Sequence, residues 1–409
     1  MFTKPKKAIG IDIGTHSVKA ILMARQGGRL RVEQVGYALV DRNQFNQDPV
    51  LAQSDAANLA VQGWPLNQCY IVGALPGQTI VIRYPRFQDM PNDRLAEAVE
   101  REAGQNIPYD LSEVFLDWSL LDTVTEGDSV QLKVLLVAAK HEIIDTRVQV
   151  AESAGIHYNV LGVDSLALSD AAEVCALLNP QETVAMINLG ASSTSIHFAK
   201  DGVSNFIRDV NWGARELVNS IMKARRVDAD QATHLLSHGD PEVAPAPVMA
   251  PEPIAEPPAA APADDFSSDL GGSLLDPFDD ELGDLSGAAP AAPPPPPPAA
   301  AATEEQPIEQ ILATPMSRLV NEVRRSFDFY EQQLYERPVD RIMLSGGVAH
   351  LPLIQQALRD ELGIDDVVVA DPTASALNLS NDRSMQLLRD HAPAFMVAVG
   401  LAARGMVDL

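Results

Sequence analysis

The same strand-loop-strand pattern occurs twice in this chain of 409 residues. The first copy centres on Asp12-Ile13-Gly14, between β-rich runs at 8–13 and 17–23, and the second centres on Asn188-Leu189-Gly190, 176 residues further on. A third strand follows each copy after a glycine-containing turn, at 30–39 and at 203–209. A repeat of this length predicts a duplicated α/β domain, with two lobes and a cleft between them.

Hydrophobic periodicity predicts further strands and helices around the two copies. Between the copies, strands are expected at 69–74, 80–84, 114–121 and 131–138, and helices at 93–103 and 142–154. After the second copy, helices are expected at 214–226, 228–238, 308–336, 353–362 and 393–404, with strands at 341–344 and 367–370. The predicted parts are a first lobe (1–84), an inserted α+β subdomain (85–155), a return of the first lobe (156–180), a second lobe (181–239, continued at 308–390) and a C-terminal helix returning to the first lobe (391–409).

One segment, residues 240–307, differs in composition from the rest of the chain. It holds 17 of the 30 prolines and 14 of the 56 acidic residues, and it has no Lys, Arg or His. The run Pro293–Pro298 forces local polyproline II geometry, and the low-complexity composition predicts a disordered insert. An island of acidic and hydrophobic residues from Asp264 to Leu285 is either part of a solvated spacer or a short motif that docks on a partner.

Charge and composition exclude several classes of protein. The net charge of −26 argues against a nucleic-acid binder, which needs a basic face to release counterions. The two cysteines, Cys69 and Cys175, lie in apolar runs without metal or redox spacing, so we expect two buried thiols and no disulfide framework. No apolar stretch approaches the roughly 20 residues of a membrane helix, and the N-terminus lacks a signal-peptide core. We therefore expect a cytoplasmic protein that reaches a membrane only through a partner.

The loop of the first copy, from Asp12 to Lys19, has the residues of a phosphate site. A tight turn between antiparallel strands points successive backbone N–H groups and the hydroxyls of Thr15 and Ser17 at one spot, while Lys19 supplies a positive charge. Asp12, at the end of the first strand, is placed to hold Mg²⁺, usually through water. His16 lies in the same turn, where an exposed histidine without a ligand is the simpler interpretation. Each loop alone is most simply a turn, but two equivalent loops can hold a nucleotide from both sides.

Two further motifs complete the candidate site. The second loop contains Gly190, Ala191, Ser192 and Thr194 after the strand that ends near Asn188. The third motif, Ser345-Gly346-Gly347-Val348, follows an apolar strand, and its glycines let the backbone approach a flat ligand such as a nucleoside.

These three loops, in this order, resemble the phosphate-1, phosphate-2 and adenosine motifs of the actin, Hsp70 and sugar-kinase superfamily. Within it the chain resembles the PilM family, the cytoplasmic actin-like components of type IV pilus assembly. The resemblance extends through several short segments outside the loops: Ile107-Pro108-Tyr109-Asp110, Leu135–Lys140, Ala154-Gly155-Ile156, Val163–Leu168, Gly213–Leu217, Arg324–Tyr330 and Ala398–Ala402. It covers nearly the whole chain except 240–307, and it implies an actin-like, duplicated ribonuclease-H-like ATPase fold.

The resemblance also implies roles for particular residues, with ATP and Mg²⁺ as ligands. By position, the first phosphate loop is Asp12, Gly14, Thr15, His16, Ser17 and Lys19, with Asp12 as the magnesium residue; the second is Asn188, Gly190, Ala191, Ser192 and Thr194; the adenosine motif is Gly346, Gly347 and Val348; and Glu216 flanks the adenine and ribose. Asn188 departs from the family pattern, which has an Asp there. Because phosphoryl transfer depends on positioned metal and water, we expect a nucleotide binder with little hydrolysis.

By the same resemblance, the partner is the short N-terminal cytoplasmic tail of a bitopic inner-membrane protein like PilN. The expected groove is formed by parts of residues 1–84 and of the 85–155 block. Other pilus platform or motor components, and self-association, are further contacts that the resemblance leaves open, whereas direct membrane insertion is not expected. Two alternatives within the superfamily remain: a sugar- or acetate-kinase-type phosphotransferase, against which Asn188 argues, and an FtsA-like division or filament protein, which usually ends in an amphipathic membrane helix that we do not find after Arg404.

Overall fold

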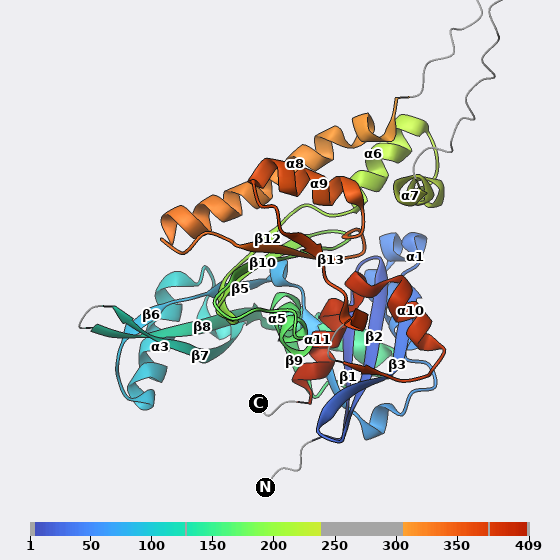
Figure 1. Ribbon diagram of the computed structural model, residues 1–409. Helices are drawn as coiled ribbons and strands as arrows, with labels where there is room; N and C mark the ends of the chain where they lie inside the picture. The colour runs from blue at the N-terminus through green and yellow to red at the C-terminus, as the bar shows by residue number, and fades with distance from the viewer. Residues whose placement is uncertain (1–4, 127–128, 239–305, 375–376, 407–409) are drawn as a thin grey trace, which may run out of the picture. The chain divides into compact units, whose positions relative to one another are not determined.

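The two copies of the repeat form two separate sheets (Figure 1), whose strand orders correspond except for one additional edge strand in the first. In this computed structural model, residues 5–126, 129–238, 306–374 and 377–406 are described. Almost all of them belong to one compact unit made of residues 1–239 and 307–409. The predicted disorder at 240–307 and the island from Asp264 to Leu285 fall, apart from positions 306 and 307, outside the described residues.

The first-lobe sheet has the strand order β15-β3-β2-β1-β4-β9. Its strands are β1 (Lys7–Ile13), β2 (Ser17–Gln26), β3 (Arg29–Leu39), β4 (Tyr70–Leu75), β9 (Val160–Val163) and β15 (Asn378–Leu379). The second-lobe sheet has the order β12-β11-β10-β13-β14, from β10 (Thr183–Leu189), β11 (Thr194–Lys200), β12 (Val203–Val210), β13 (Arg341–Gly346) and β14 (Val367–Val369). β1 and β10 each pair antiparallel with the next strand and parallel with a later one. The predicted duplication of an α/β domain is confirmed.

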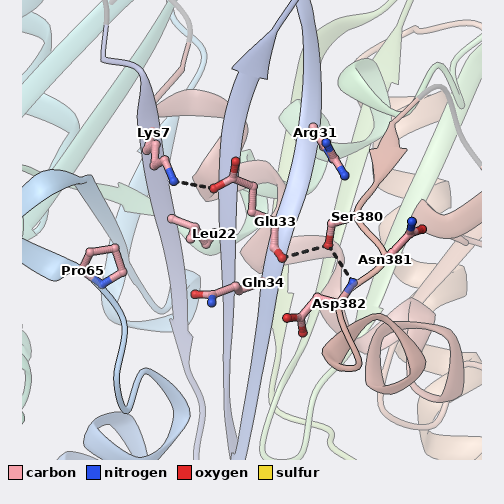
Figure 2. A pocket seen from close by; sticks show the side chains of 9 residues that line it. All are labelled: Lys7, Leu22, Arg31, Glu33, Gln34, Pro65, Ser380, Asn381 and Asp382. Carbon is pink, nitrogen blue, oxygen red and sulfur yellow. Dashed lines mark hydrogen bonds and ion pairs between the residues drawn. The ribbon is translucent and has the colours of Figure 1, made fainter.

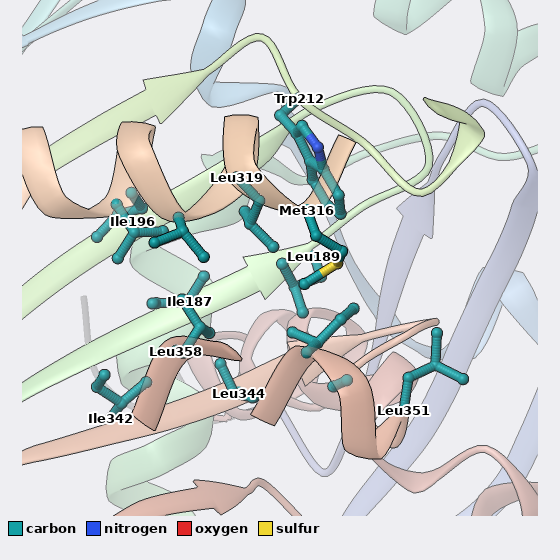
Figure 3. Packing of buried hydrophobic residues seen from close by; sticks show 14 of the residues in the cluster. Ile187, Leu189, Ile196, Trp212, Met316, Leu319, Ile342, Leu344, Leu351 and Leu358 are labelled. Atoms are coloured by element: carbon teal, nitrogen blue, oxygen red, sulfur yellow. The ribbon is translucent and has the colours of Figure 1, made fainter. Parts of the chain in front are cut away.

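Helices cover both faces of each sheet, which explains why the central strands are almost continuously apolar. On one face of the first-lobe sheet, Ile9 and Ile11 pack with Ala57 and Val150 of α2 (Pro49–Ala60) and α4 (His141–Ser153). On one face of the second-lobe sheet, the cluster around Trp212 is covered by α6 (Arg215–Arg225), α8 (Ile308–Asp328) and α9 (Pro352–Leu362) (Figure 3). Each of these helices therefore buries an apolar face against a sheet.

Two helices, α5 (Asp164–Val174) and α11 (Met396–Arg404), pack against both sheets at once. One apolar cluster joins Ile21 of β2, Ala171 of α5, Val399 of α11 and Met186 of β10, so these helices form a layer between the two sheets. The layer is thin because glycines allow backbones to touch. A Cβ on Gly400 of α11 would overlap the carbonyl oxygen of Ala167 in α5.

A third sheet, the subdomain sheet, is formed by β5 (Ile80–Arg83), β6 (Arg86–Gln88), β7 (Val114–Glu126) and β8 (Ser129–Lys140). One of its faces packs on α3 (Asn92–Asn106). The packing places its limits differently from the predicted block 85–155. β5 lies before that block but pairs with β8, and α4 lies inside it but packs into the core of the first lobe.

Several elements differ from the sequence-based expectation. The helix expected at 308–336 ends at Asp328 and continues as a π-helical turn (Phe329–Gln333). The apolar helix expected from residue 393 begins at Met396, after a 3₁₀ turn (Ala392–Phe395). The helices that the sequence pattern did not predict are α1 (Arg42–Gln47), α2, α5 and α10 (Ser384–Asp390). The helix expected at 228–238 is α7 (Ala229–His238). Short 3₁₀ turns occur at Leu66–Gln68, Gly77–Thr79, Leu111–Glu113 and Pro372–Ala374. The buried face of α2 consists largely of alanine, which gives almost no amphipathic signal.

We predict that Gly400→Ala strongly destabilises the protein. The added methyl group would force α5 and α11 apart, and overpacking of this kind costs about 1–3 kcal/mol or more. Thermal or urea denaturation of the purified variant measures the loss. Gly104→Ala is the matched control, because a Cβ on Gly104 of α3 has room at 3.7 Å from Leu111 and should be neutral or stabilising. Equal stability of the two variants would contradict the close packing of α5 and α11.

Candidate functional site

Two hairpin loops with the same geometry lie at corresponding ends of the two sheets. In the first, between β1 and β2, the N–H of Gly14 donates to the carbonyl of Ser17 at 3.1 Å. In the second, between β10 and β11, the N–H of Gly190 donates to the carbonyl of Ser193 at 3.0 Å. The offset is 176 residues for both donor and acceptor, so the sequence repeat extends to single hydrogen bonds in the loops.

The two loops touch each other. The hydroxyls of Thr15 and Ser192 are 2.6 Å apart, which is a hydrogen bond between two residues that are 177 positions apart in the chain. A second contact joins the lobes nearby, where Arg42 of α1 donates to Asn219 of α6 at 3.4 Å. The residues predicted for the two phosphate loops are therefore brought together at one place.

Positive charge surrounds this contact. Lys19 lies beside Asp12 across the β1–β2 ladder, with 3.1 Å between its ammonium nitrogen and the carboxylate. Partial burial, and then the charges of Lys19, Arg215 and Arg42, lower the pKa of His16 below its ordinary value of 6.5. The imidazole is therefore neutral near pH 7, mainly because it is partly buried, and the smaller effects of the three cations show that basic side chains lie near this turn.

The second loop also holds the start of helix α6. The N–H groups of Ala214 and Arg215 donate to the carbonyls of Gly190 and Ala191 at 2.9 and 3.0 Å. Glu216, in the first turn of α6, forms an ion pair with Arg318 of α8, with 2.5 Å between the nearest atoms. The predicted nucleoside residue Glu216 thus lies next to the second loop, with its carboxylate already engaged.

The third motif adjoins the second loop within the sheet. Ser345 lies opposite Asn188 in the β10–β13 pair, and its hydroxyl is 3.3 Å from the Asn188 amide oxygen. Gly346 has φ +96°, and a Cβ there would overlap the carbonyl of Leu189, so this position requires glycine. The space beside Gly347 is open, as the predicted approach of a flat ligand needs, whereas Val348 packs on the core of the second lobe.

Two of the predicted hydroxyl residues lie inside the protein. Ser17 is 5% exposed, and Thr194 is fully buried with a hydroxyl that has no hydrogen-bond partner among the described residues. Both begin the second strand of a hairpin, and their side chains face the interior. Of the four predicted hydroxyl residues, Thr15 and Ser192 are therefore the two that remain accessible to a ligand.

Two carboxylates near the loops, Asp164 and Asp209, were missed by the sequence analysis. Asp164 begins α5 and accepts hydrogen bonds from the N–H groups of Gly77 (2.9 Å) and Ser165 (2.6 Å). Burial, and then the charges of Asp209 and Asp12, raise the pKa of Asp164 to about 7. Burial also raises the pKa of Asp209 to about 6. Near neutral pH, Asp164 is therefore partly protonated, next to a site rich in positive charge.

Among the described residues, no group of three or more His, Cys, Asp or Glu side chains is arranged to hold a metal ion. Asp12 lies beside the first loop, paired with Lys19, and Asn188 offers only a neutral oxygen. This donor set fits a Mg²⁺ ion that is held mainly by phosphate oxygens and water, with Asp12 in its outer coordination sphere.

A buried hydrogen-bond chain leads from Asp164 towards the subdomain sheet. The ring of His197 contacts the carbonyl of Ser165 at 2.9 Å and the hydroxyl of Ser204 at 2.8 Å, and Ser204 is 2.6 Å from the hydroxyl of Tyr84. Burial lowers the pKa of His197 to about 4, so the ring is neutral. A carbonyl can only accept, so Nδ1 carries the proton, Ser204 donates to Nε2, and Tyr84 donates to Ser204.

Tyr84 lies between β5 and β6, where the subdomain sheet meets the second lobe. The Lys133 ammonium lies over its ring, 5.6 Å from the centroid. Nearby, Glu336 is paired with Lys200 of β11 at 2.7 Å and with Arg86 of β6 at 3.4 Å. Burial and these neighbouring cations lower the pKa of Lys133 to about 8. The chain from Ser165 to Tyr84 thus ends in a charged contact between two parts of the fold.

A separate hollow of about 470 Å³ lies on the first-lobe sheet, away from the hairpin loops (Figure 2). It is bounded by β1, β3 and the loop after β15, with an ion pair of 2.6 Å between Lys7 and Glu33 at its rim. Lys7 is at the opposite end of β1 from Asp12, so this hollow is not part of the candidate site.

The family model described as type IV pilus assembly protein PilM matches residues 10–249 and 303–406. The chain belongs to this family. The match passes over 250–302, so most of the proline-rich insert is not part of the family pattern. Among the described residues, none of the helices combines the length and the apolar character that crossing a bilayer requires.

A solved structure with a TM-score above 0.5 supports the fold independently. A structure described as the PilM-PilN type IV pilus biogenesis complex is 20% identical, with a TM-score of 0.69 and coverage of 98% of this chain and 99% of that chain. EutJ, an ethanolamine utilization protein from Carboxydothermus hydrogenoformans, has 12% identity, a TM-score of 0.47 and coverage of 98% and 90%. MreB 5 of Spiroplasma citri, bound to AMPPNP, has 12% identity, a TM-score of 0.44 and coverage of 97% and 95%. The family match and the PilM-PilN structure confirm the predicted two-lobed fold and the PilM resemblance.

We predict that Asp164→Asn stabilises the protein at high pH. The raised pKa means that the folded state holds a proton which the unfolded state has lost, so the stabilisation from this carboxyl is present below pH 4 and disappears as the pH rises through about 7. Asparagine keeps the acceptor oxygen for Gly77 and Ser165 and carries no charge. At pH 8 the variant should melt about 2 °C above wild type, the shift that about 1 kcal/mol gives in a domain of this size.

The measurement is thermal melting of both proteins between pH 5 and 8. The difference should shrink or reverse at pH 5, where wild-type Asp164 is protonated. Asp145→Asn, which removes an exposed carboxylate from α4, controls for the change in net charge. A pH-independent difference between Asp164→Asn and wild type would show that Asp164 titrates normally.

Proposed function

We propose that this PilM family member is an ATP-binding scaffold of the type IV pilus machinery, which docks the cytoplasmic N-terminal tail of a PilN-like bitopic protein. The chain would lie in the cytoplasm and reach the inner membrane through that tail. The observation that carries the nucleotide part is the contact between Thr15 and Ser192, which joins the two duplicated loops. The partner follows from the family and from the fold shared with the PilM-PilN complex.

The loops suit a phosphate chain for two physical reasons. The hydroxyls of Thr15 and Ser192 lie 2.6 Å apart where the loops meet, and Lys19 and Arg215 provide positive charge. Phosphate entering between the loops would replace the Thr15–Ser192 hydrogen bond with two hydrogen bonds to phosphate oxygens. The third motif, with open space at Gly347, would take the nucleoside.

Hydrolysis is expected to be slow. The second hairpin has Asn188 where an aspartate would help hold metal and water, and its amide oxygen is near the hydroxyl of Ser345. Asp164 lies close to the loops, but a pKa of about 7 leaves it partly protonated, so it does not replace a fixed negative charge. The protein therefore fits a scaffold whose partner binding depends on bound nucleotide better than it fits a phosphotransferase. The family match also disfavours the kinase and FtsA-like alternatives.

We predict that Lys19→Ala lowers the affinity for ATP at least tenfold. The variant loses a charge that faces the phosphates and leaves Asp12 unpaired, and a tenfold change corresponds to about 1.4 kcal/mol. Calorimetric titration with ATP and Mg²⁺ measures the effect, and EDTA should weaken wild-type binding. Lys7→Ala is the matched control, since it removes a lysine from the other end of β1. Equal affinities for both variants would exclude the first hairpin as the phosphate site.

The hydrogen bonds that link His197, Ser204 and Tyr84 provide a route by which nucleotide binding would affect binding of the tail. Ser165 begins α5 beside Asp164, and Tyr84 lies at the subdomain, so a shift of α5 on nucleotide binding would be felt at Tyr84 through two side chains. Nucleotide can change the affinity for the tail only if the two states differ in their contacts at the tail groove. The charged contact around Glu336 is placed to differ between such states.

We predict that ATP changes the affinity for the PilN-like tail by about fivefold or more, the lower end of typical couplings. Tyr84→Phe, which removes one hydroxyl, should bring this ratio close to one without altering the affinity for ATP. Fluorescence anisotropy of a labelled tail peptide, with and without ATP, measures the ratio. Tyr37→Phe is the control, because Tyr37 stacks on His391 and is not part of the hydrogen bonds that link His197, Ser204 and Tyr84. If Tyr84→Phe keeps the full ratio, coupling does not pass through this hydroxyl; if wild type does not bind the tail, the partner is wrong.

A further inference from the structure

The outer strand of the subdomain sheet, β7, has one edge without a strand partner among the described residues. β8 is the central strand of this sheet. β7 pairs with β8 on one side, and β5 and β6 both pair with β8 on the other side. β7 is 13 residues long. A long unpaired edge exposes main-chain donors and acceptors that can bind another extended chain.

Large apolar side chains gather at this edge. Phe115 is 57% exposed, Leu120 is 42% exposed, and Tyr109, in the segment before β7, is 40% exposed. Phe115 lies on the face opposite α3, and Leu120 lies on the same face as Leu116 and Trp118, which pack beside α3. Apolar surface is therefore available on both faces of the edge strand, as a neighbouring strand would require.

Two acidic side chains lie on the face opposite α3. Asp117 and Asp122 are exposed, and Asp122 lies opposite the nearly buried Lys133 on β8. Each carboxylate accepts a hydrogen bond from the next main-chain N–H: Asp117 from Trp118 at 2.9 Å, and Asp122 from Thr123 at 2.7 Å. These carboxylates protect the edge from indiscriminate pairing, and a cation that binds them would release the two N–H donors.

We propose that the free edge of β7 is a docking site for an extended segment of another chain in which basic and apolar residues alternate. The register shift between Leu120 and Asp122 places Asp117 and Asp122 on one face of β7, with Ser119 between them, so side chains on that face of an added strand would meet the two carboxylates. The intervening side chains would meet the apolar face of Leu116, Trp118 and Leu120. This two-residue period selects an alternating segment, and the main-chain ladder provides affinity without further sequence requirements.

Charge decides against a second copy of this chain as the occupant. Two β7 edges placed side by side would bring Asp117 and Asp122 of one chain close to those of the other, in a protein whose net charge is −26. A basic segment, in contrast, neutralises these carboxylates. This site is additional to the groove proposed for the pilus tail, so it can fail without affecting that proposal.

The test uses the full chain and an amidated peptide probe with the sequence Arg-Val-Lys-Val-Arg-Val-Lys. We expect the double variant Asp117→Lys/Asp122→Lys to lose at least tenfold in affinity at low salt. The matched control, Glu97→Lys/Glu100→Lys, makes the same charge change on exposed positions of α3 in the same subdomain and should lose much less. Leu120→Ala should weaken binding as well, since it removes apolar contact from the face that the valines would meet, without changing charge.

Two further probes separate strand addition from general attraction. Replacing the central valine, the fourth residue of the peptide, with proline should abolish binding, because proline has no N–H to donate to β7. Hydrogen exchange should slow at 114–122 when the original peptide is bound. Equal losses in the two charge variants, or full binding of the proline peptide, would overturn the proposal. So would a β7-dependent dimer in sedimentation, which would make a second copy the occupant.

Discussion

The fold depends on one close contact, the packing of α5 against α11 between the two sheets. Gly400 lets the two helix backbones touch at Ala167, and the cluster around them joins strands of both lobes. Because protein interiors are close-packed, a layer of this kind transmits small displacements instead of absorbing them. α5 also starts at Asp164, next to the hairpin loops. The helix that packs between the two lobes therefore begins beside the candidate site.

The site combines one strongly positive side with carboxylates whose pKa values are raised. Lys19, Arg42 and Arg215 lower the pKa of His16, whereas burial raises those of Asp164 and Asp209. Both shifts favour neutral forms, but with a pKa of about 6 Asp209 is still mostly ionised near pH 7, and Lys19 is paired with Asp12. Arg42 and Arg215 are the further cations beside the loops that can attract a polyanionic ligand.

Sequence reasoning could predict the repeat because glycine turns and apolar strands are local signals. The loops around Gly14 and Gly190 were found in this way, and the structure brings them into contact through Thr15 and Ser192. It could not predict α2, whose buried face is mostly alanine, nor the roles of Asp164 and Asp209 among 56 acidic residues. Their proximity depends on the tertiary packing of α5 and β12, and the limits of the subdomain likewise depend on the pairing of β5 with β8.

The two hairpins keep the same backbone but differ in charge. At corresponding ladder positions, the first has the ion pair Asp12–Lys19 and the second has the neutral pair Asn188 and Ser195. The second hairpin has neutral residues at both positions, so neither hairpin places a solitary charge in this ladder. The two hairpins therefore have nearly the same backbone, but only the first contains charged side chains at these positions. An elongated anionic molecule held between the hairpins would have one preferred orientation, which the duplicated backbone alone would not impose.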